Sequence, residues 1–169
     1  MTNERSARDE DGFTLIELMV VVLIIGILIA IALPTFLGAR AKAQNKGAQS
    51  DLRNAVLTAK VVYTDTQDYT LITPATMFAA EPSLNYLAGN VASASGNKYG
   101  VSFRVFNYGE VDMARLSASG ECEYIRTIDE QGPAPTDIPG TYMGKATGIA
   151  CTGNQIAAYG TGVANFGGW

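Results

Sequence analysis

The feature that most constrains this chain is an apolar run from residue 13 to residue 33, which contains a single charge, Glu17. About 20 apolar residues are enough to cross the ~30 Å hydrocarbon core of a bilayer as a helix. A helix is also how a single span satisfies its backbone hydrogen bonds in lipid. The run therefore predicts a membrane-spanning helix. A carboxylate inside such a helix costs at least ~2.5 kcal/mol on insertion scales, so Glu17 needs a partner or a purpose.

The partner of Glu17 has to come from outside the apolar run, because the run contains no basic residue. If the chain were cut after Gly12, the new α-amino group of Phe13 would be a cation close to Glu17. Opposite charges attract strongly in a low dielectric whereas each alone is penalised, so this pairing would favour one register between neighbouring copies. The alternative is an ordinary signal peptide or single-pass anchor in which Glu17 is incidental. A signal peptide is cut after its apolar core, however, whereas a cut after Gly12 would precede the core.

The string GFTLIE at residues 12–17, with Gly26 and Pro34 downstream, resembles the N-terminal signature of type IV pilins, in particular type IVa-like prepilins, and of the related pseudopilins. The resemblance covers about 22 contiguous residues. It implies that residues 1–12 are a leader, that a prepilin peptidase and methyltransferase cuts between Gly12 and Phe13, and that Phe13 becomes N-methylphenylalanine. It further implies that Glu17 faces the Phe13 amine of a neighbouring subunit, and that Gly26 and Pro34 belong to the assembly segment.

Beyond Pro34 the apolar pattern becomes amphipathic, with one apolar helical face. This face consists of Ala48, Leu52, Ala55, Val56, Ala59, Val62 and Tyr63. A helix over residues 13–64 would be about 75–80 Å long, too long to be covered by one small domain. Its first half is therefore expected in lipid or against other copies. Because Gly26 lowers helix propensity and Pro34 lacks an amide donor, a kink or local melting is predicted between them. A tolerated proline bend without function is the alternative.

Residues 65–169 are predicted to form a globular head, in which 65–96 is a connecting loop, the αβ-loop of the resembled family, and 97–130 form a β-sheet. Short helical turns are expected at Thr76–Ala80 and Pro82–Leu87. Alternation of apolar with small or polar residues predicts the first of five strands, and turn residues separate the further candidates. The five are Tyr99–Val105, Glu110–Leu116, Cys122–Ile128 and, more weakly, Thr141–Lys145 and Gln155–Tyr159. An antiparallel meander is the simplest topology, and it would close Val101, Phe103 and Val105 over Leu52, Val56 and Tyr63. The fold class is α+β, a long helix packed by its C-terminal half on an antiparallel sheet.

The only two cysteines are Cys122 and Cys151. They lie in the part expected outside the cytoplasm, where an even count favours a disulfide over two reduced core thiols, the alternative. A bridge closing about 30 residues would contribute roughly 3–4 kcal/mol in the chain-entropy model. Paired C-terminal cysteines are also common in the resembled family, so 122–151 is predicted as a disulfide-bounded region.

No catalytic, metal or cofactor site is predicted. The chain has no histidine, and it contains no phosphate-binding loop, zinc motif or nucleophile elbow. Pairs of acidic residues lack the spacing of a calcium loop, and charged turns explain them better. These pairs are Asp65/Asp68, Glu121/Glu123 and Asp129/Glu130. A formal charge of -4 gives no general reason to bind nucleic acid strongly.

Together these observations predict a non-enzymatic structural subunit. The resemblance implies a single-pass protein of the cytoplasmic membrane that an assembly platform polymerises helically with copies of itself into an extracellular pilus for adhesion, twitching motility or DNA uptake. Two alternatives share the signature, a type II secretion pseudopilin and a minor pilin. A third, of another class, is a membrane-anchored surface binding domain that never polymerises.

Overall fold

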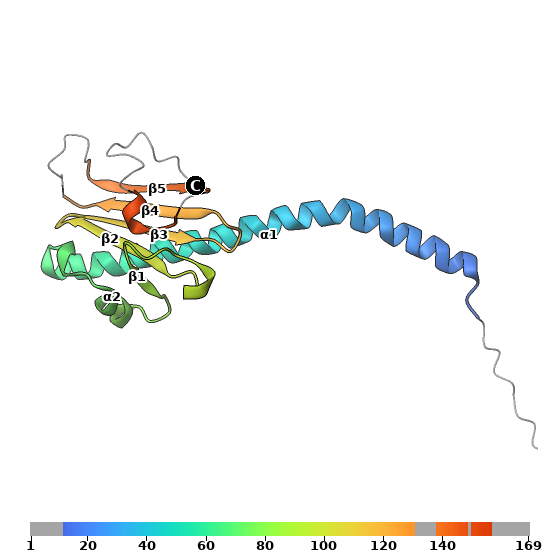
Figure 1. The fold of residues 1–169 in the computed structure, drawn as a ribbon, viewed down its shortest axis with the longest axis horizontal. Helices are drawn as coiled ribbons and strands as arrows, with labels where there is room; N and C mark the ends of the chain where they lie inside the picture. Colours follow the sequence, from blue (N-terminus) through green and yellow to red (C-terminus); the bar gives the residue numbers. More distant parts are fainter. Residues whose placement is uncertain (1–11, 131–137, 149, 157–169) are drawn as a thin grey trace, which may run out of the picture. The chain divides into compact units, whose positions relative to one another are not determined.

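The computed structural model describes residues 12–130, 138–148 and 150–156. The chain divides into two units, Met1–Arg40 and Ala41–Trp169, and helix α1 contributes to both. Figure 1 labels the main elements. In chain order the elements are α1 (Leu15–Thr66), the 3₁₀ turn η1 (Tyr69–Leu71), α2 (Pro74–Ala80), β1 (Tyr86–Ala88), the 3₁₀ turn η2 (Ser95–Asn97), β2 (Val101–Asn107), β3 (Glu110–Leu116), β4 (Cys122–Ile128), β5 (Gly140–Ala146) and α3 (Gly153–Ile156).

Helix α1 begins and ends two residues later than the predicted 13–64. It ends because Gln67 adopts a left-handed backbone, with φ 55°, and donates its amide to the Tyr63 carbonyl at 2.6 Å. Every residue of α1 is helical, including those between Gly26 and Pro34. Local melting is therefore not a property of the isolated subunit, and it stays a prediction for the assembled state.

Strands β2 to β5 form the predicted antiparallel meander. Their register aligns Phe103 with Met113, Met113 with Ile125, and Ile125 with Met143. Because side chains alternate between the two faces of a strand, these residues form one apolar row across a single face. The strand predictions over 99–105, 110–116, 122–128 and 141–145 are confirmed to within two residues at each end.

The core of the head lies between that sheet face and the second half of α1. Leu52, Val56 and Tyr63 belong to the same buried cluster as Val101 and Phe103, and Val105 packs against it. This is the predicted closure of the sheet over the apolar helical stripe. The apolar helical face that the sequence predicts is thus covered by the sheet of the same chain.

Two predictions for the head are wrong. Pro82–Leu87 does not form a helical turn, since Tyr86–Ala88 is strand β1, paired in parallel with Val101–Phe103. Three residues carry too little periodicity to reveal a strand that depends on a distant partner. The weak strand at Gln155–Tyr159 is also wrong where it is described, because Gly153–Ile156 is the short helix α3. Residues 157–159 lie outside the described residues.

Candidate assembly segment

The first half of α1 exposes apolar surface along its whole length. Every residue from Gly12 to Arg40 is exposed, and Phe13 is 88% exposed. Within the part of the chain that the structure describes, α1 is the one helix long and apolar enough to cross a membrane, and none of its most apolar stretch is buried. A monomeric soluble protein rarely exposes so large an apolar surface. This segment therefore has to be covered by lipid or by protein.

Glu17 belongs to a reciprocal hydrogen-bonded cap at the start of α1. The Thr14 amide and hydroxyl both donate to Glu17 Oε2, at 2.9 and 2.6 Å, and the Glu17 amide donates to Thr14 Oγ1 at 3.3 Å. This is a capping box, in which two amides left over at a helix N-terminus are satisfied by side chains. Sequence reasoning missed it, although the spacing Thr-x-x-Glu ahead of an apolar run is its signature.

All of the predicted processing and assembly residues lie on this exposed segment. Gly12 and Phe13 immediately precede α1, Glu17 lies in its first turn, and Gly26 and Pro34 lie further along it. A Cβ added at Gly26 would meet no atom within 4 Å. The small size of this residue is therefore not required by contacts inside the described subunit.

The predicted disulfide between Cys122 and Cys151 is present, and both cysteines are buried. It ties the start of β4 to the segment that leads into α3. Beyond it, the Gly153 amide donates to Ser102 Oγ at 3.0 Å. A Cβ on Gly153 would lie 2.7 Å from the Arg104 amide, so a glycine is needed for this approach to β2. The C-terminal part of the described chain is thus fixed to the sheet by a covalent and a close backbone contact.

A buried ionic cluster lies under the opposite sheet face from the α1 core. Asp112 is fully buried and accepts from Arg126 Nε at 2.7 Å and from Arg104 Nη2 at 3.3 Å. Arg126 also pairs with the buried Glu110 at 3.1 Å. No sequence motif marks these four residues, because their burial depends on what covers this face of the sheet. The residues form a charge-compensated structural network and present no nucleophile paired with a base.

The fold is that of a pilin-like α+β protein, with a long apolar N-terminal helix that continues into a sheet-covered head. A family model described as the prokaryotic N-terminal methylation motif matches residues 7–33. No solved structure was found to match the chain.

The chain is 30% identical to the type IV major pilin of Myxococcus xanthus over 149 residues, 88% of this chain and 51% of that protein. The chain thus spans about half the length of that relative. It is 33% identical to the type IV wide pilus major component of Thermus thermophilus over 93 residues, 54% of this chain and 71% of that protein. It is also 28% identical to the type II secretion system core protein G of Aeromonas hydrophila over 124 residues, 68% of this chain and 87% of that protein.

The chain belongs to the type IV pilin and pseudopilin family, as the resemblance at residues 12–34 predicted. The proteins that it matches are structural pilin and secretion-system subunits rather than enzymes.

Proposed function

We propose that this protein is a structural subunit of a type IV pilus, made as a prepilin and polymerised helically through the first half of α1. The observation that carries the proposal is the fully exposed apolar segment of residues 13–40 with a single carboxylate near its start. Lipid can cover such a segment before assembly, and identical segments of other copies can cover it afterwards. A heterologous contact that does not close into a ring generates a fibre from one kind of subunit.

Processing would occur between Gly12 and Phe13, followed by N-methylation of Phe13. The capping geometry supports a partner for Glu17 at that point. Both Thr14 donors bond to Oε2, so Oε1 remains able to accept from an amine supplied by a neighbouring copy. In a water-poor filament interior a charge-assisted bond of this kind is roughly twice as strong as a neutral one. The pair would therefore select one register between subunits.

Gly26 and Pro34 are proposed to act between subunits. Because no atom of the subunit approaches a Cβ placed on Gly26, the free space there is available to a neighbouring helix. Pro34 lacks an amide donor, so the helix around it loses one hydrogen bond and unwinds at lower cost than elsewhere. We expect both positions to influence how the assembly segments pack.

The expected partners and locations follow from the proposed processing and polymerisation. Prepilin peptidase would process the chain in the cytoplasmic membrane, an assembly platform would extract it from there, and the finished pilus would lie outside the cell. The head would then form the outer surface, used for adhesion, twitching motility or DNA uptake. The mildly acidic charge of -4 gives no support to strong direct DNA binding by the subunit.

The test is intact mass measurement and N-terminal sequencing of protein sheared from the cell surface. We expect a chain that begins at N-methylated Phe13. A chain that still carries residue 1 would overturn processing and favour a singly anchored surface domain that does not polymerise.

Three variants separate the charge of Glu17 from its role as a helix cap. Glu17→Gln keeps a hydrogen-bonding group for the capping box but removes the charge. Thr14→Ala keeps the charge but removes the hydroxyl part of the cap, and Glu17→Ala removes the charge together with the carboxylate part of the cap. If the charge sets the register, Glu17→Gln and Glu17→Ala abolish sheared filaments whereas Thr14→Ala retains them. Normal filaments from Glu17→Gln would contradict the pairing.

A second candidate function is that of a type II secretion pseudopilin, favoured by the similarity to core protein G of Aeromonas hydrophila over 87% of that protein. Deletion of the gene distinguishes the two functions. A pilus subunit is expected to be required for surface filaments, whereas a pseudopilin is required for release of secreted proteins and leaves the filaments intact. A bound-calcium assay on the purified chain is a second discriminator, because the major pseudopilin of the family carries a calcium site.

A further inference from the structure

The head carries a groove, lined by polar and apolar side chains, that the assembly segment does not explain. It consists of three depressions of about 340, 200 and 410 Å³, which we call the head groove. The first two share Asp51, Tyr99 and Arg115, and the second and third share Lys98 and residues 83–85. Shared walls make the three depressions neighbours along one path. All of the lining residues belong to the unit Ala41–Trp169.

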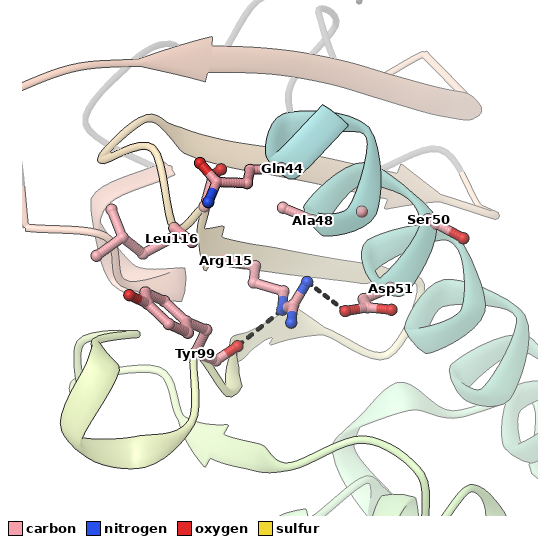
Figure 2. A pocket seen from close by; sticks show the side chains of 10 residues that line it. Gln44, Ala48, Ser50, Asp51, Tyr99, Arg115 and Leu116 are labelled. Carbon is pink, nitrogen blue, oxygen red and sulfur yellow. Dashed lines mark hydrogen bonds and ion pairs between the residues drawn. The ribbon is translucent and has the colours of Figure 1, made fainter. Parts of the chain in front are cut away.

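The guanidinium of Arg115 lies in the middle of the head groove and is held there by two contacts. Arg115 of β3 forms an ion pair with Asp51 of α1, and its Nε donates to the Tyr99 carbonyl at 2.7 Å. Figure 2 shows the Arg115 side chain between Tyr99 and Asp51. Arginine has five N–H donors, and these contacts use the Nε and Nη1 atoms, so Nη2 remains for a ligand. A guanidinium held on two sides loses little freedom when it binds.

The rim of the head groove has an uncommon backbone. Lys98 and Tyr99 are consecutive residues in the left-handed region, with φ values of 56° and 53°. Non-glycine residues rarely adopt this conformation, and it persists where the surroundings hold it. Here the Asn97 side chain holds the turn, since its Nδ2 donates to the Ala92 carbonyl at 2.6 Å and its Oδ1 accepts from the Ala94 amide at 2.8 Å. The turn places Lys98 and Tyr99 on the same groove.

The lining of the head groove matches a polyhydroxylated, acidic ligand. Its charged residues are two cations, Lys98 and Arg115, and one anion, Asp51, so the groove carries a net positive charge in a chain of net charge -4. The rest of the lining is divided between two kinds of side chain. Hydroxyl and amide groups come from Gln44, Ser50, Ser83, Asn85, Asn97 and Ser117, and apolar groups come from Ala48, Phe78, Pro82, Leu84, Val101, Leu116 and Ala118. The hydroxyl and amide groups both donate and accept hydrogen bonds, as sugar hydroxyls do. The Tyr99 ring offers an apolar surface with a polar tip for the C–H face of a sugar.

We propose that the head groove binds an acidic oligosaccharide, with carboxylates facing Arg115 and Lys98 and a sugar ring against Tyr99. A peptide is the alternative occupant, and binding of oligoglutamate in the test below distinguishes it. The proposal depends on the proposed function only in that the head faces the outside of the cell. Binding by the unassembled subunit does not require polymerisation, so failure of either idea can be recognised separately.

The test is a calorimetric titration of the full-length chain in detergent micelles. The probes are oligogalacturonate, a neutral malto-oligosaccharide of matched length, and oligoglutamate of matched length and charge. We expect saturable binding of oligogalacturonate that is at least about tenfold tighter than binding of either control. Absence of saturable oligogalacturonate binding overturns the proposal. Equal binding of oligoglutamate also overturns it, in favour of a peptide or general anion surface.

Variants locate the site. Tyr99→Asn removes the ring, keeps the carbonyl that holds Arg115, and introduces a residue that tolerates the left-handed backbone. Lys98→Asn removes the cation in the same way. We expect each to weaken oligogalacturonate binding about tenfold or more. Tyr108→Asn is the matched control, because Tyr108 is 51% exposed and lies outside the groove, and it should leave the affinity unchanged.

A loss of affinity that is equal in Tyr99→Asn and Tyr108→Asn overturns the location of the site. Circular dichroism and the presence of the Cys122–Cys151 bridge verify the fold of each variant. If Tyr99→Asn fails to fold, Gln44→Ala, in the first depression of the groove, replaces it as the test variant. An unchanged affinity of Gln44→Ala for oligogalacturonate then overturns the location of the site.

Discussion

The two halves of α1 contain similar apolar residues in opposite environments. In the first half all residues from Gly12 to Arg40 are exposed, whereas in the second half Leu52, Ala55 and Ala59 have no exposed surface. The second half has a single apolar stripe, and the sheet of the same chain covers it. The first half is apolar on all sides, so one sheet could not cover it. The comparison teaches that the head is stabilised from within the chain, whereas the first half depends on partners outside it.

The largest expected effect distinguishes two leucines of the second half. Leu52 is fully buried and Leu57 is 63% exposed. Leu52→Ala should lower the free energy of unfolding of the head by about 3–5 kcal/mol, because it leaves a cavity in the core. Leu57→Ala, the matched control, should change it by less than about 0.5 kcal/mol. Denaturant unfolding in micelles, followed by tyrosine fluorescence, measures both. Equal losses would show that the two faces of the helix are not energetically distinct.

The second-largest loss of stability is expected from removal of the disulfide. Replacing both Cys122 and Cys151 with alanine opens a loop of sequence separation 29 and should cost the head roughly 3 kcal/mol. Helicity of the first half of α1 should not change, since the bridge lies wholly in the second unit. The same unfolding experiment gives the loss, and circular dichroism gives the helicity. If the double variant loses helical signal at denaturant concentrations where its head is still folded, the two regions are not independent.

Glu123 introduces a pH dependence confined to the head. Its side chain is fully buried, and within the described residues neither carboxylate oxygen has a hydrogen-bond partner. Burial raises the pKa of Glu123, and Glu121 adds to the rise, while the nearby Gln49 amide and the amines of Lys46 and Lys145 oppose it. A raised pKa means that the unfolded chain loses its proton first as the pH rises. The stability of the head should therefore fall as pH increases from the ordinary glutamate range through the raised pKa.

Glu123→Gln should relieve this penalty. We expect about 1–3 kcal/mol of added stability at neutral pH and a flatter dependence on pH. Glu121→Gln is the control, because it removes a charge that pairs with Lys145 at 3.1 Å and leaves the Glu123 carboxylate buried, so its gain should be smaller than that of Glu123→Gln. Unfolding curves at several pH values measure both variants. Added stability in Glu121→Gln but not in Glu123→Gln would show that Glu121, and not Glu123, carries the unfavourable charge.

The smallest effect concerns the cap of the first half. Thr14→Ala removes the two hydrogen bonds that the Thr14 hydroxyl makes, one to Glu17 Oε2 and one from the Glu17 amide, and should cost the helix start about 1 kcal/mol. Faster hydrogen exchange of the amides in the first turn, with no change in head stability, is the expected result. Unchanged exchange would mean that the cap does not stabilise this end of α1.

Several elements of the fold could be predicted because their signals are local. In β3 the apolar Val111 and Met113 alternate with Glu110 and Asp112, and the stripe from Ala48 to Tyr63 repeats at helical spacing. The apolar run at residues 13–33 can likewise be recognised from composition alone. In contrast, β1 has three residues and depends on pairing with β2, and α3 depends on the bridge at Cys151 and the approach to Ser102. Such elements arise from contacts between distant parts of the chain, which no local pattern reports.

The sequence by itself determined that one long helix carries a lone carboxylate through an apolar run, that a sheet covers its second half, and that two cysteines are available to bridge the head. Hydrophobic periodicity and composition are local properties, and they are sufficient for these features. Only the tertiary structure decided that Asp112 and Arg126 are buried together, that Glu123 lacks a partner within the described residues, and that Tyr99, Asp51 and Arg115 form one groove. Each of these depends on which distant residues meet and on what excludes water from them.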